Sequence, residues 1–308
     1  MKKDFDFIFI GGAGRSGTSL VQKLLLSNLE ISGGPEFYFT KPIFELLANM
    51  QSELQTGVVH ESFDTQKLRR HFIDFYSFFL EPYQESDTRY ISEKTPSNLE
   101  VARTLLHTFP KSTFIHVFRD GRAVVNSHLK VKKRAKQSGK YYHDIGLWKT
   151  SKYWIRYMAL ADELKAEFPD RFLEVQYEEL IEEPIPTLSP IFDHLTLKMN
   201  PELKDPASIE LKGNKKDAHI NDIWYTREMY SKGYDTSRKE GWRKESSYWS
   251  QLVLNGHLFE GLRSKGYEVS SAYQPLNQLI YFASNWKSIL KRWWIARQIA
   301  AIKRRILN

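Results

Sequence analysis

A glycine-rich run near the N-terminus, GAGRSGTS at residues 12–19, contains the residues best suited to bind an anion. It lies between a strand-like apolar stretch and a helix-like one, so its backbone N–H groups can converge on a ligand at a helix N-terminus. The spacing from Gly12 to Gly17 is that of a P-loop, but Thr18 stands where a P-loop has lysine. That lysine reaches the β- and γ-phosphates of a triphosphate, so its absence favours a shorter anionic group. The side chains predicted to hold this group are Arg15, Ser16, Thr18 and Ser19. The alternative is a glycine-rich turn that binds nothing.

A second candidate anion site follows the most apolar stretch of the chain, STFIHVF at residues 112–118. Arg119 comes directly after this stretch, and Ser127 lies eight residues beyond Arg119. An arginine at a strand end and a hydroxyl about two helical turns further on can converge on one phosphate. The carboxyl ends of parallel strands are also where α/β sheets bind ligands. By itself the pattern is equally typical of an arginine–aspartate turn at the surface.

The elements that must position these residues alternate between strand and helix. We expect strands at residues 5–10, 89–93, 112–118 and 172–175. We expect helices at residues 17–28, 42–54, 66–80, 97 to before 110, after 121, and 146–168. This order predicts an α/β fold, a three-layer sandwich with a mostly parallel central sheet. Residues 212–241 show little periodicity and are predicted as a long loop, followed by a helix at residues 247–265.

Composition excludes several classes of protein. The 308 residues include no cysteine, which excludes disulfides, thiolate metal sites and a cysteine nucleophile. We find no metal-ligand spacing of His, Asp and Glu, and expect no metal. No apolar run approaches the ~18 residues needed to span a bilayer, and Asp4 and Asp6 interrupt any signal-like stretch. We therefore expect a soluble cytoplasmic protein.

Four motifs in sequence order resemble the sulfotransferases that use 3′-phosphoadenosine 5′-phosphosulfate (PAPS). They are GRSGTS, SEKTPSN, FPKSTFIHVFRDGRAVVNS and VQYEELIEEP, and the pattern is most similar to tyrosylprotein sulfotransferases and related bacterial enzymes. The resemblance runs from residue 5 to about residue 184, and more faintly through residues 241–243 to 266–267. It implies a P-loop, nucleotide-kinase-like fold in a sulfotransferase domain of residues 1–270.

The resemblance also implies the donor site. PAPS carries a 5′-phosphosulfate and a separate 3′-phosphate, which matches two anion sites without a γ-phosphate lysine. Gly14, Gly17 and the four side chains named above would hold the 5′ side, and Arg119 and Ser127 the 3′-phosphate. Tyr177, which opens the YEEL motif, would line the nucleotide site. Weaker candidates for a nucleotide lid are Ser237, Arg238 and Lys239.

Two further residues are implied as catalytic. Glu36 lies 21 residues after Arg15, the spacing of a catalytic glutamate in the tyrosylprotein enzymes, and would be the general base. Lys94 matches the family lysine on the leaving-group side. The alternatives are an exposed loop glutamate and a solvated lysine. We therefore predict sulfuryl transfer from PAPS to a hydroxyl acceptor. A P-loop kinase or NTPase and a catalytically silent nucleotide-binding regulator remain as alternative hypotheses.

The acceptor is not named by these motifs. The tyrosylprotein enzymes follow their glutamate with Thr-Arg, whereas this chain has Phe37 and Tyr38. The aromatic pair favours a sugar, a lipid or a small molecule over a peptide tyrosine. Residues about 38–83 and 212–241 are expected to form the acceptor pocket.

Histidines and a basic segment leave further hypotheses open. His60, His71, His107 and His116 are interpreted as structural. His128 and His143 fall near the cofactor end of the sheet and stay open as bases. Residues 130–140 carry six basic residues and no acid, which fits either a solvated helix face or a collar that attracts anions.

Positive charge is concentrated at the C-terminus. Residues 269–308 carry seven of the 45 basic residues and no acid, which leaves 38 bases against 37 acids in the rest of the chain. Apolar residues recur there at three- and four-residue steps beside Trp286, Trp293 and Trp294. We predict a basic amphipathic tail at residues 271–308 that binds anionic membranes. The alternative is a terminal helix that packs on the enzyme.

Overall fold

The computed structural model describes residues 5–56, 64–142, 146–204, 234–280 and 283. The chain divides into two compact units, residues 1–244 and 245–308. The first unit contains a five-stranded sheet in the order β2-β3-β1-β4-β5, and every pair of neighbouring strands is parallel. The strands are β1 (Asp6–Gly11), β2 (Ile31–Gly33), β3 (Tyr90–Lys94), β4 (Thr113–Phe118) and β5 (Phe172–Gln176). The chain continues from β1 to β3 on one side of it and to β4 on the other, so the strand order reverses at β1. The carboxyl ends of β1, β3 and β4 therefore meet at a switch point of the kind that binds ligands in α/β sheets.

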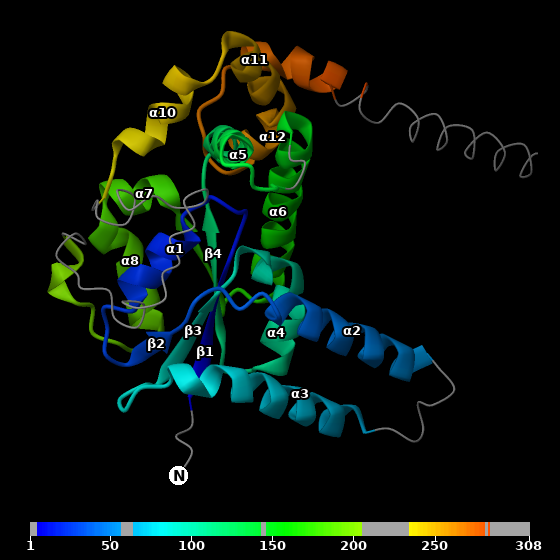
Figure 1. Cartoon of the computed structure of the whole chain (residues 1–308), viewed down its shortest axis with the longest axis vertical. Coiled ribbons are helices and arrows are strands. Elements are labelled where there is room, and N and C mark those ends of the chain that lie inside the picture. The colour runs from blue at the N-terminus through cyan, green and yellow to red at the C-terminus, as the bar shows by residue number, and fades with distance from the viewer. Residues whose placement is uncertain (1–4, 57–63, 143–145, 205–233, 281–282, 284–308) are drawn as a thin grey trace, which may run out of the picture. The chain divides into compact units, whose positions relative to one another are not determined.

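One face of the sheet is covered by α1 (Thr18–Leu25), α7 (Tyr177–Glu182) and α8 (Pro184–His194), as Figure 1 shows. Ile8 and Ile10 of β1 point to this face and pack with apolar side chains of α1 and α8. Side chains alternate along a strand, so Phe7 and Phe9 point to the other face. All four residues are buried, as expected of a central strand between two helical layers.

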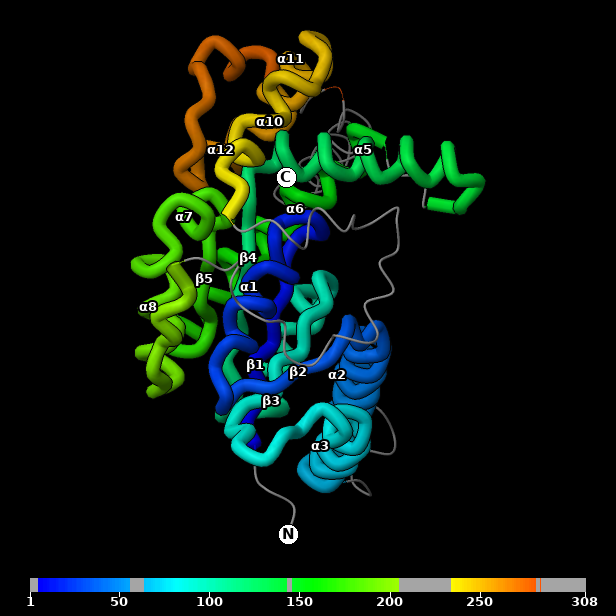
Figure 2. Tube along the Cα trace, turned by 60° about the vertical axis from the view of Figure 1, so that its left-hand side comes forward, coloured from blue at the N-terminus to red at the C-terminus, as the bar shows by residue number. Residues whose placement is uncertain are grey.

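Aromatic side chains fill the opposite layer. Its helices are α2 (Thr40–Thr56), α3 (Thr65–Leu80), α4 (Ala102–Thr108) and α6 (Leu147–Glu167). Phe7 lies 5.6 Å from Tyr76 of α3 and 4.7 Å from Phe109, measured between ring centroids. Figure 2 shows α2 and α3 side by side on the side of the sheet away from α8. Helix α5 (Gly121–Gln137) follows β4 directly and packs against α6.

Short helices complete the described chain. Four 3₁₀ helices occupy Glu81–Tyr83, Pro96–Val101, Pro201–Lys204 and Ser271–Tyr273. Helix α10 (Ser237–Glu245) lies at the boundary between the two units, and the second unit contains α11 (Tyr248–His257) and α12 (Phe259–Ser264). Within the second unit, Gly256 leaves room for the side chains of Leu276 and Ile280. Among the described residues, no helix is both long enough and apolar enough to cross a membrane.

The predicted α/β fold is confirmed, and the sheet is wholly parallel. Four of its strands were predicted; the fifth, β2, is only three residues long and too short to show alternation. The helix predicted from residue 97 begins only at Ala102, because Pro96–Val101 is a 3₁₀ turn before α4. The single helix predicted at 247–265 is two helices that meet at Leu258. The predicted loop is wrong at its C-terminal end, where residues 237–241 are helical; residues 212–233 lie outside the described residues. The proposed boundary between residues 270 and 271 stays a prediction.

Candidate donor and transfer site

The glycine-rich run forms a loop between β1 and α1. Arg15 has a φ of 74° and Gly17 a φ of 102°, which is the left-handed region. Ser16 is fully buried, and its hydroxyl has no hydrogen-bond partner among the residues that the structure describes. An unpaired buried hydroxyl costs free energy unless a ligand satisfies it. The loop thus offers an unused hydrogen-bonding group beside a cationic side chain.

The two predicted anion sites are joined. Arg15 donates from Nε to the hydroxyl of Ser127 on α5 over 3.2 Å, although 112 residues separate them. Arg119 stacks its guanidinium 4.3 Å from the ring centroid of Tyr177, and that ring also lies against Gly17. Five of the predicted donor-site residues therefore lie together at the carboxyl ends of β1, β4 and β5.

Main-chain atoms of Gly14 are held from two helices. Its N–H donates to the hydroxyl of Tyr153 on α6 over 3.0 Å, and its carbonyl oxygen accepts from His128 Nε2 at 3.1 Å. His128 Nδ1 in turn lies 2.7 Å from the hydroxyl of Tyr142. Burial, together with the positive charge of Arg15, lowers the pKa of His128 to about 4. A histidine that stays neutral in this way supports the loop, which answers part of the open question about His128; His143 lies outside the described residues.

The two predicted catalytic residues form an ion pair. Lys94 is the last residue of β3, and its Nζ lies 2.6 Å from Oε1 of Glu36. Both side chains are largely buried, with 7% of Lys94 and 18% of Glu36 exposed. Lys94 is in register with Ile10 of β1, so the pair lies beside the strand that leads into the glycine-rich loop. A carboxylate and an ammonium group thus lie at the strand end next to the candidate donor loop.

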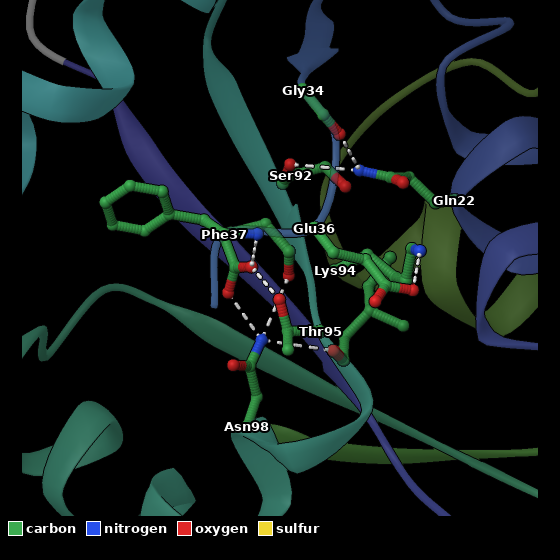
Figure 3. A network of polar contacts seen from close by, with 10 residues as sticks. Gln22, Gly34, Glu36, Phe37, Ser92, Lys94, Thr95 and Asn98 are labelled. Carbon is green, nitrogen blue, oxygen red and sulfur yellow. Dashed lines mark hydrogen bonds and ion pairs between the residues drawn. The ribbon is translucent and has the colours of Figure 1, made fainter. Parts of the chain in front are cut away.

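The segment before Glu36 is held by α1 and β3. Gln22 of α1 donates from Nε2 to the carbonyl oxygens of Gly34, at 3.2 Å, and Ser92, at 3.3 Å (Figure 3). Gln22 follows the glycine-rich loop by five residues. The helix that begins at the loop therefore also supports the segment that carries Glu36.

The weaker candidates for a nucleotide lid pair largely with acids. Ser237 and Arg238 bond Asp235, over 2.5 and 3.0 Å, and Lys239 bonds Glu182 over 2.7 Å. The main-chain oxygen of Arg238, however, accepts from Arg119 Nη2 at 2.7 Å. The structure therefore brings this segment to Arg119 through its backbone. Its role as a lid stays a prediction.

Several residues around the site were missed by the sequence analysis. Glu93, Tyr153 and Glu178 take part in the contacts of the loops, and Glu178 accepts the main-chain N–H of Asp120 over 3.1 Å. Glu93 has a weak sequence signal, since it stands next to Lys94 within the SEKTPSN motif. Tyr153 has none, because an aromatic residue on a long helix is typical of a core position. Within the described part of the chain, no three His, Asp or Glu side chains gather in a way that could hold a metal ion.

Comparison with known proteins agrees with the fold and the motifs. Residues 6–201 match the model of the Sulfotransferase family. Protein-tyrosine sulfotransferase 1 of Danio rerio is 28% identical over 203 residues, 64% of this chain and 55% of the relative. Protein-tyrosine sulfotransferase 2 of Gallus gallus is 33% identical over 129 residues, 41% of this chain and 34% of the relative. The matches thus span between a third and little more than half of these relatives.

Solved structures show the same fold. The sulfotransferase domain from the curacin biosynthetic pathway superposes with a TM-score of 0.58 at 17% identity, covering 87% of this chain and all of that one. The sulfotransferase domain of the Synechococcus PCC 7002 olefin synthase gives a TM-score of 0.52 at 18% identity, covering 88% of this chain and 99% of that one. The family model covers more than half of the 308 residues and confirms the resemblance seen in the motifs. The chain belongs to the sulfotransferase family.

Proposed function

We propose that this protein transfers the sulfuryl group of PAPS to a hydroxyl acceptor. The acceptor oxygen attacks sulfur in line with the bond from sulfur to the bridging phosphate oxygen. As the new sulfur–oxygen bond forms and the bridging bond breaks, the acceptor proton passes to the Glu36 carboxylate. Lys94 stabilises the negative charge that develops on the leaving phosphate, which departs as 3′,5′-adenosine bisphosphate.

The observation that carries this proposal is the pairing of Glu36 and Lys94 beside a phosphate loop that lacks the P-loop lysine. In the 2.6 Å ion pair, a carboxylate and an ammonium group lie together at the end of β3, which supports the roles proposed for them. Before the donor binds, each group neutralises the other. A bound donor offers Lys94 a second anion, so the carboxylate becomes free to accept a proton.

The donor site is supported by what surrounds the loop. Ser16 has an unpaired buried hydroxyl, and Arg15 and Arg119 supply positive charge near Ser127 and Tyr177. We assign the 5′-phosphosulfate to the loop and the 3′-phosphate to Arg119 and Ser127. A kinase or NTPase is a poorer fit, because Thr18 replaces the lysine that such enzymes place on the β- and γ-phosphates. A silent regulator would have no need of the buried Glu36–Lys94 pair.

Calorimetry and labelled donor test the proposal together. The chain is expected to bind 3′,5′-adenosine bisphosphate and to move ³⁵S from PAPS to at least one of a phenol, a sugar alcohol, a sterol and a tyrosine peptide. Glu36→Gln should lower this turnover at least ~100-fold, the size expected for loss of a general base, while binding is kept. Glu45→Gln, at an exposed glutamate of α2, is the matched control and should be active.

Each failure has its own meaning. Absence of binding heat at concentrations suited to micromolar affinity would overturn the donor assignment. Turnover that depends on ATP would favour the kinase hypothesis. Binding without transfer to any of the four acceptors or to water would favour the regulator.

For the acceptor, we propose an apolar or flat hydroxyl compound. The curated relatives are protein-tyrosine sulfotransferases, but this chain places aromatic residues after its glutamate. Tyr38 and Phe39 are 70% and 65% exposed, so their rings are open to a ligand. Aromatic rings bind sugars, lipids and flat metabolites better than acidic peptides. Among the four labelled reactions, the tyrosine peptide should therefore be the slowest.

We also propose that the basic tail attaches the protein to anionic membrane surfaces. The proposal rests on the sequence of residues 276–307, most of which lie outside the described residues. Seven bases interleaved with tryptophan and isoleucine are typical of a helix that lies among lipid headgroups.

A further inference from the structure

Phe37, the residue after the proposed base, makes contacts through its main-chain N–H, its carbonyl oxygen and its ring. Its main-chain N–H donates to Oε1 of Glu93 over 3.3 Å. Its carbonyl oxygen accepts from the N–H of Thr40, at 3.0 Å, and from the Thr40 hydroxyl, at 3.1 Å. Its ring lies 5.9 Å from Tyr76 and 5.6 Å from Phe79, between centroids. Phe37 is thus a fixed point of the segment that carries Glu36.

Strand β3 holds Glu36 and Phe37 with two consecutive side chains. Lys94 binds the carboxylate of Glu36, and Glu93 binds the N–H of Phe37. Because side chains alternate along a strand, Glu93 and Lys94 point in opposite directions. Figure 3 shows the same alternation in the segment they hold, with the ring of Phe37 on one side and Glu36 facing Lys94 on the other.

Packing alone does not explain a glutamate at position 93, because burying its carboxylate costs free energy. It is 2% exposed, and burial raises its pKa to about 7, although hydrogen bonds from Thr95, Asn98 and Phe37 oppose this rise. Thr95 donates from its hydroxyl over 2.6 Å and Asn98 from Nδ2 over 2.5 Å. A buried carboxylate is a poor source of stability compared with an apolar side chain of the same size. What it does supply here is an acceptor aimed at one particular main-chain N–H.

We propose that Glu93 is a positioning residue for sulfuryl transfer: by holding the N–H of Phe37, it sets the direction in which Glu36 points. The inference rests on the proposed role of Glu36 as general base. This chain departs from the tyrosylprotein pattern at Phe37, whose ring packs among aromatic residues of α3. The hydrogen bond to Glu93 and the packing of the ring therefore fix the same residue. A displacement of about 1 Å at a catalytic group can cost roughly 100-fold in rate, so one main-chain hydrogen bond can matter to catalysis.

Two substitutions at Glu93 separate positioning from stability. Glu93→Gln keeps an acceptor oxygen for Phe37. Asn98, whose Oδ1 has no partner within the described part of the chain, can turn to accept from the new amide. Glu93→Met has similar length and no strong acceptor. The matched control is Thr113→Val, which removes a buried hydroxyl that bonds His194 at 2.9 Å, at the opposite end of the sheet from Lys94.

The readouts are kcat and KM for PAPS, with the acceptor that gives the highest ³⁵S turnover, the Kd of 3′,5′-adenosine bisphosphate, and hydrogen exchange of residues 34–39. Glu93→Met is expected to lower kcat at least tenfold, with the KM for PAPS and the Kd each changed less than threefold. Exchange in residues 34–39 should become faster. Glu93→Gln should recover kcat to within about threefold of wild type, and Thr113→Val should change only stability.

Three results would contradict the proposal in different ways. If Glu93→Met keeps wild-type kcat while Glu36→Gln is inactive, Glu93 is structural only. If Glu93→Met and Thr113→Val lose kcat equally, in proportion to unfolding, the loss is one of stability and the proposal is wrong. If Glu36→Gln is itself active, the base assignment fails and takes the positioning role with it. Unchanged exchange at residues 34–39 in Glu93→Met would show separately that Glu93 does not hold Phe37.

Discussion

At the scale of single residues, His128 supports the candidate donor loop through one atom, the carbonyl oxygen of Gly14. A carbonyl only accepts, so Nε2 carries the ring proton and Nδ1 accepts from the hydroxyl of Tyr142. A neutral ring is needed for both bonds at once. Burial favours that neutral form, and nearby Arg15 favours it further, which accounts for a pKa of about 4.

This arrangement predicts a loss of stability in acid. Between its ordinary pKa of 6.5 and the folded value of about 4, His128 takes up a proton in the unfolded chain but not in the folded one. The contribution is therefore fully present above pH 6.5 and is lost as pH falls towards 4. The loss is on the order of 2 kcal/mol by about pH 4.5, since one pKa unit corresponds to about 1.4 kcal/mol.

His128→Gln cannot titrate, so the stability gap between wild type and variant should narrow by that amount from about pH 7 to about pH 4.5. Urea unfolding at these two values measures the gap. Parallel stability curves for the two proteins would contradict the neutral, buried form of His128.

At the scale of elements, helix α1 begins directly after Gly17, and the position tolerates no side chain. Its φ is 102°, and a Cβ there would lie 2.5 Å from Cδ2 of Tyr177, the residue that opens α7. The close approach lets the loop, the helix N-terminus and the ring of Tyr177 share one place. The ring also stacks on Arg119, so the glycine lies at the junction of the two candidate anion sites.

Gly17→Ala is therefore expected to cost roughly 2–3 kcal/mol in stability, from backbone strain and overpacking together, and to weaken 3′,5′-adenosine bisphosphate binding at least tenfold. Gly139→Ala is the matched control, because Gly139 also has a positive φ, of 62°, but nothing lies within 4 Å of a Cβ built there. That variant should lose only about 1 kcal/mol and bind normally. Equal binding by the two variants would mean that the contact with Tyr177 does not shape the donor site. Thermal unfolding and calorimetry give both quantities.

At the scale of the whole molecule, charge is divided unevenly along the chain. The first 268 residues are close to neutral, whereas the last 40 carry seven bases and no acid. Each base near an anionic lipid surface contributes about 1 kcal/mol, and the contribution falls with salt. Tryptophan side chains favour the same interface.

The full chain is therefore expected to co-sediment with vesicles that contain phosphatidylserine at low salt, and to be released as salt rises. Replacing the seven basic residues after residue 268 by glutamine should abolish the binding. The matched control replaces the six bases of residues 130–140 in the same way and should leave it intact. Failure of the wild-type chain to pellet, or equal loss in both variants, would contradict a membrane role for the tail.

The class of fold, the order of its main elements and the two candidate anion-binding motifs could be predicted from the sequence alone. These features depend on local patterns: apolar strands, glycines at loop positions and helical periodicity. Each pattern can be recognised within a few residues of sequence. The motif order also sufficed to identify the family. Predictions from local patterns were wrong where an element is very short, as at β2, or where a helix is interrupted, as between α11 and α12.

The contacts that hold the candidate site in place could not be predicted from the sequence, because they form only in the folded chain. The hydrogen bond from Arg15 to Ser127, the two bonds to Gly14 and the hold of Glu93 on Phe37 join residues between 56 and 139 positions apart. Such contacts have no period in the sequence, because they depend on where strands and helices meet after the chain has crossed the sheet. A glutamate inside a strand and a tyrosine on a helix come to support the candidate transfer site only when folding brings their oxygen atoms within reach of another segment's backbone.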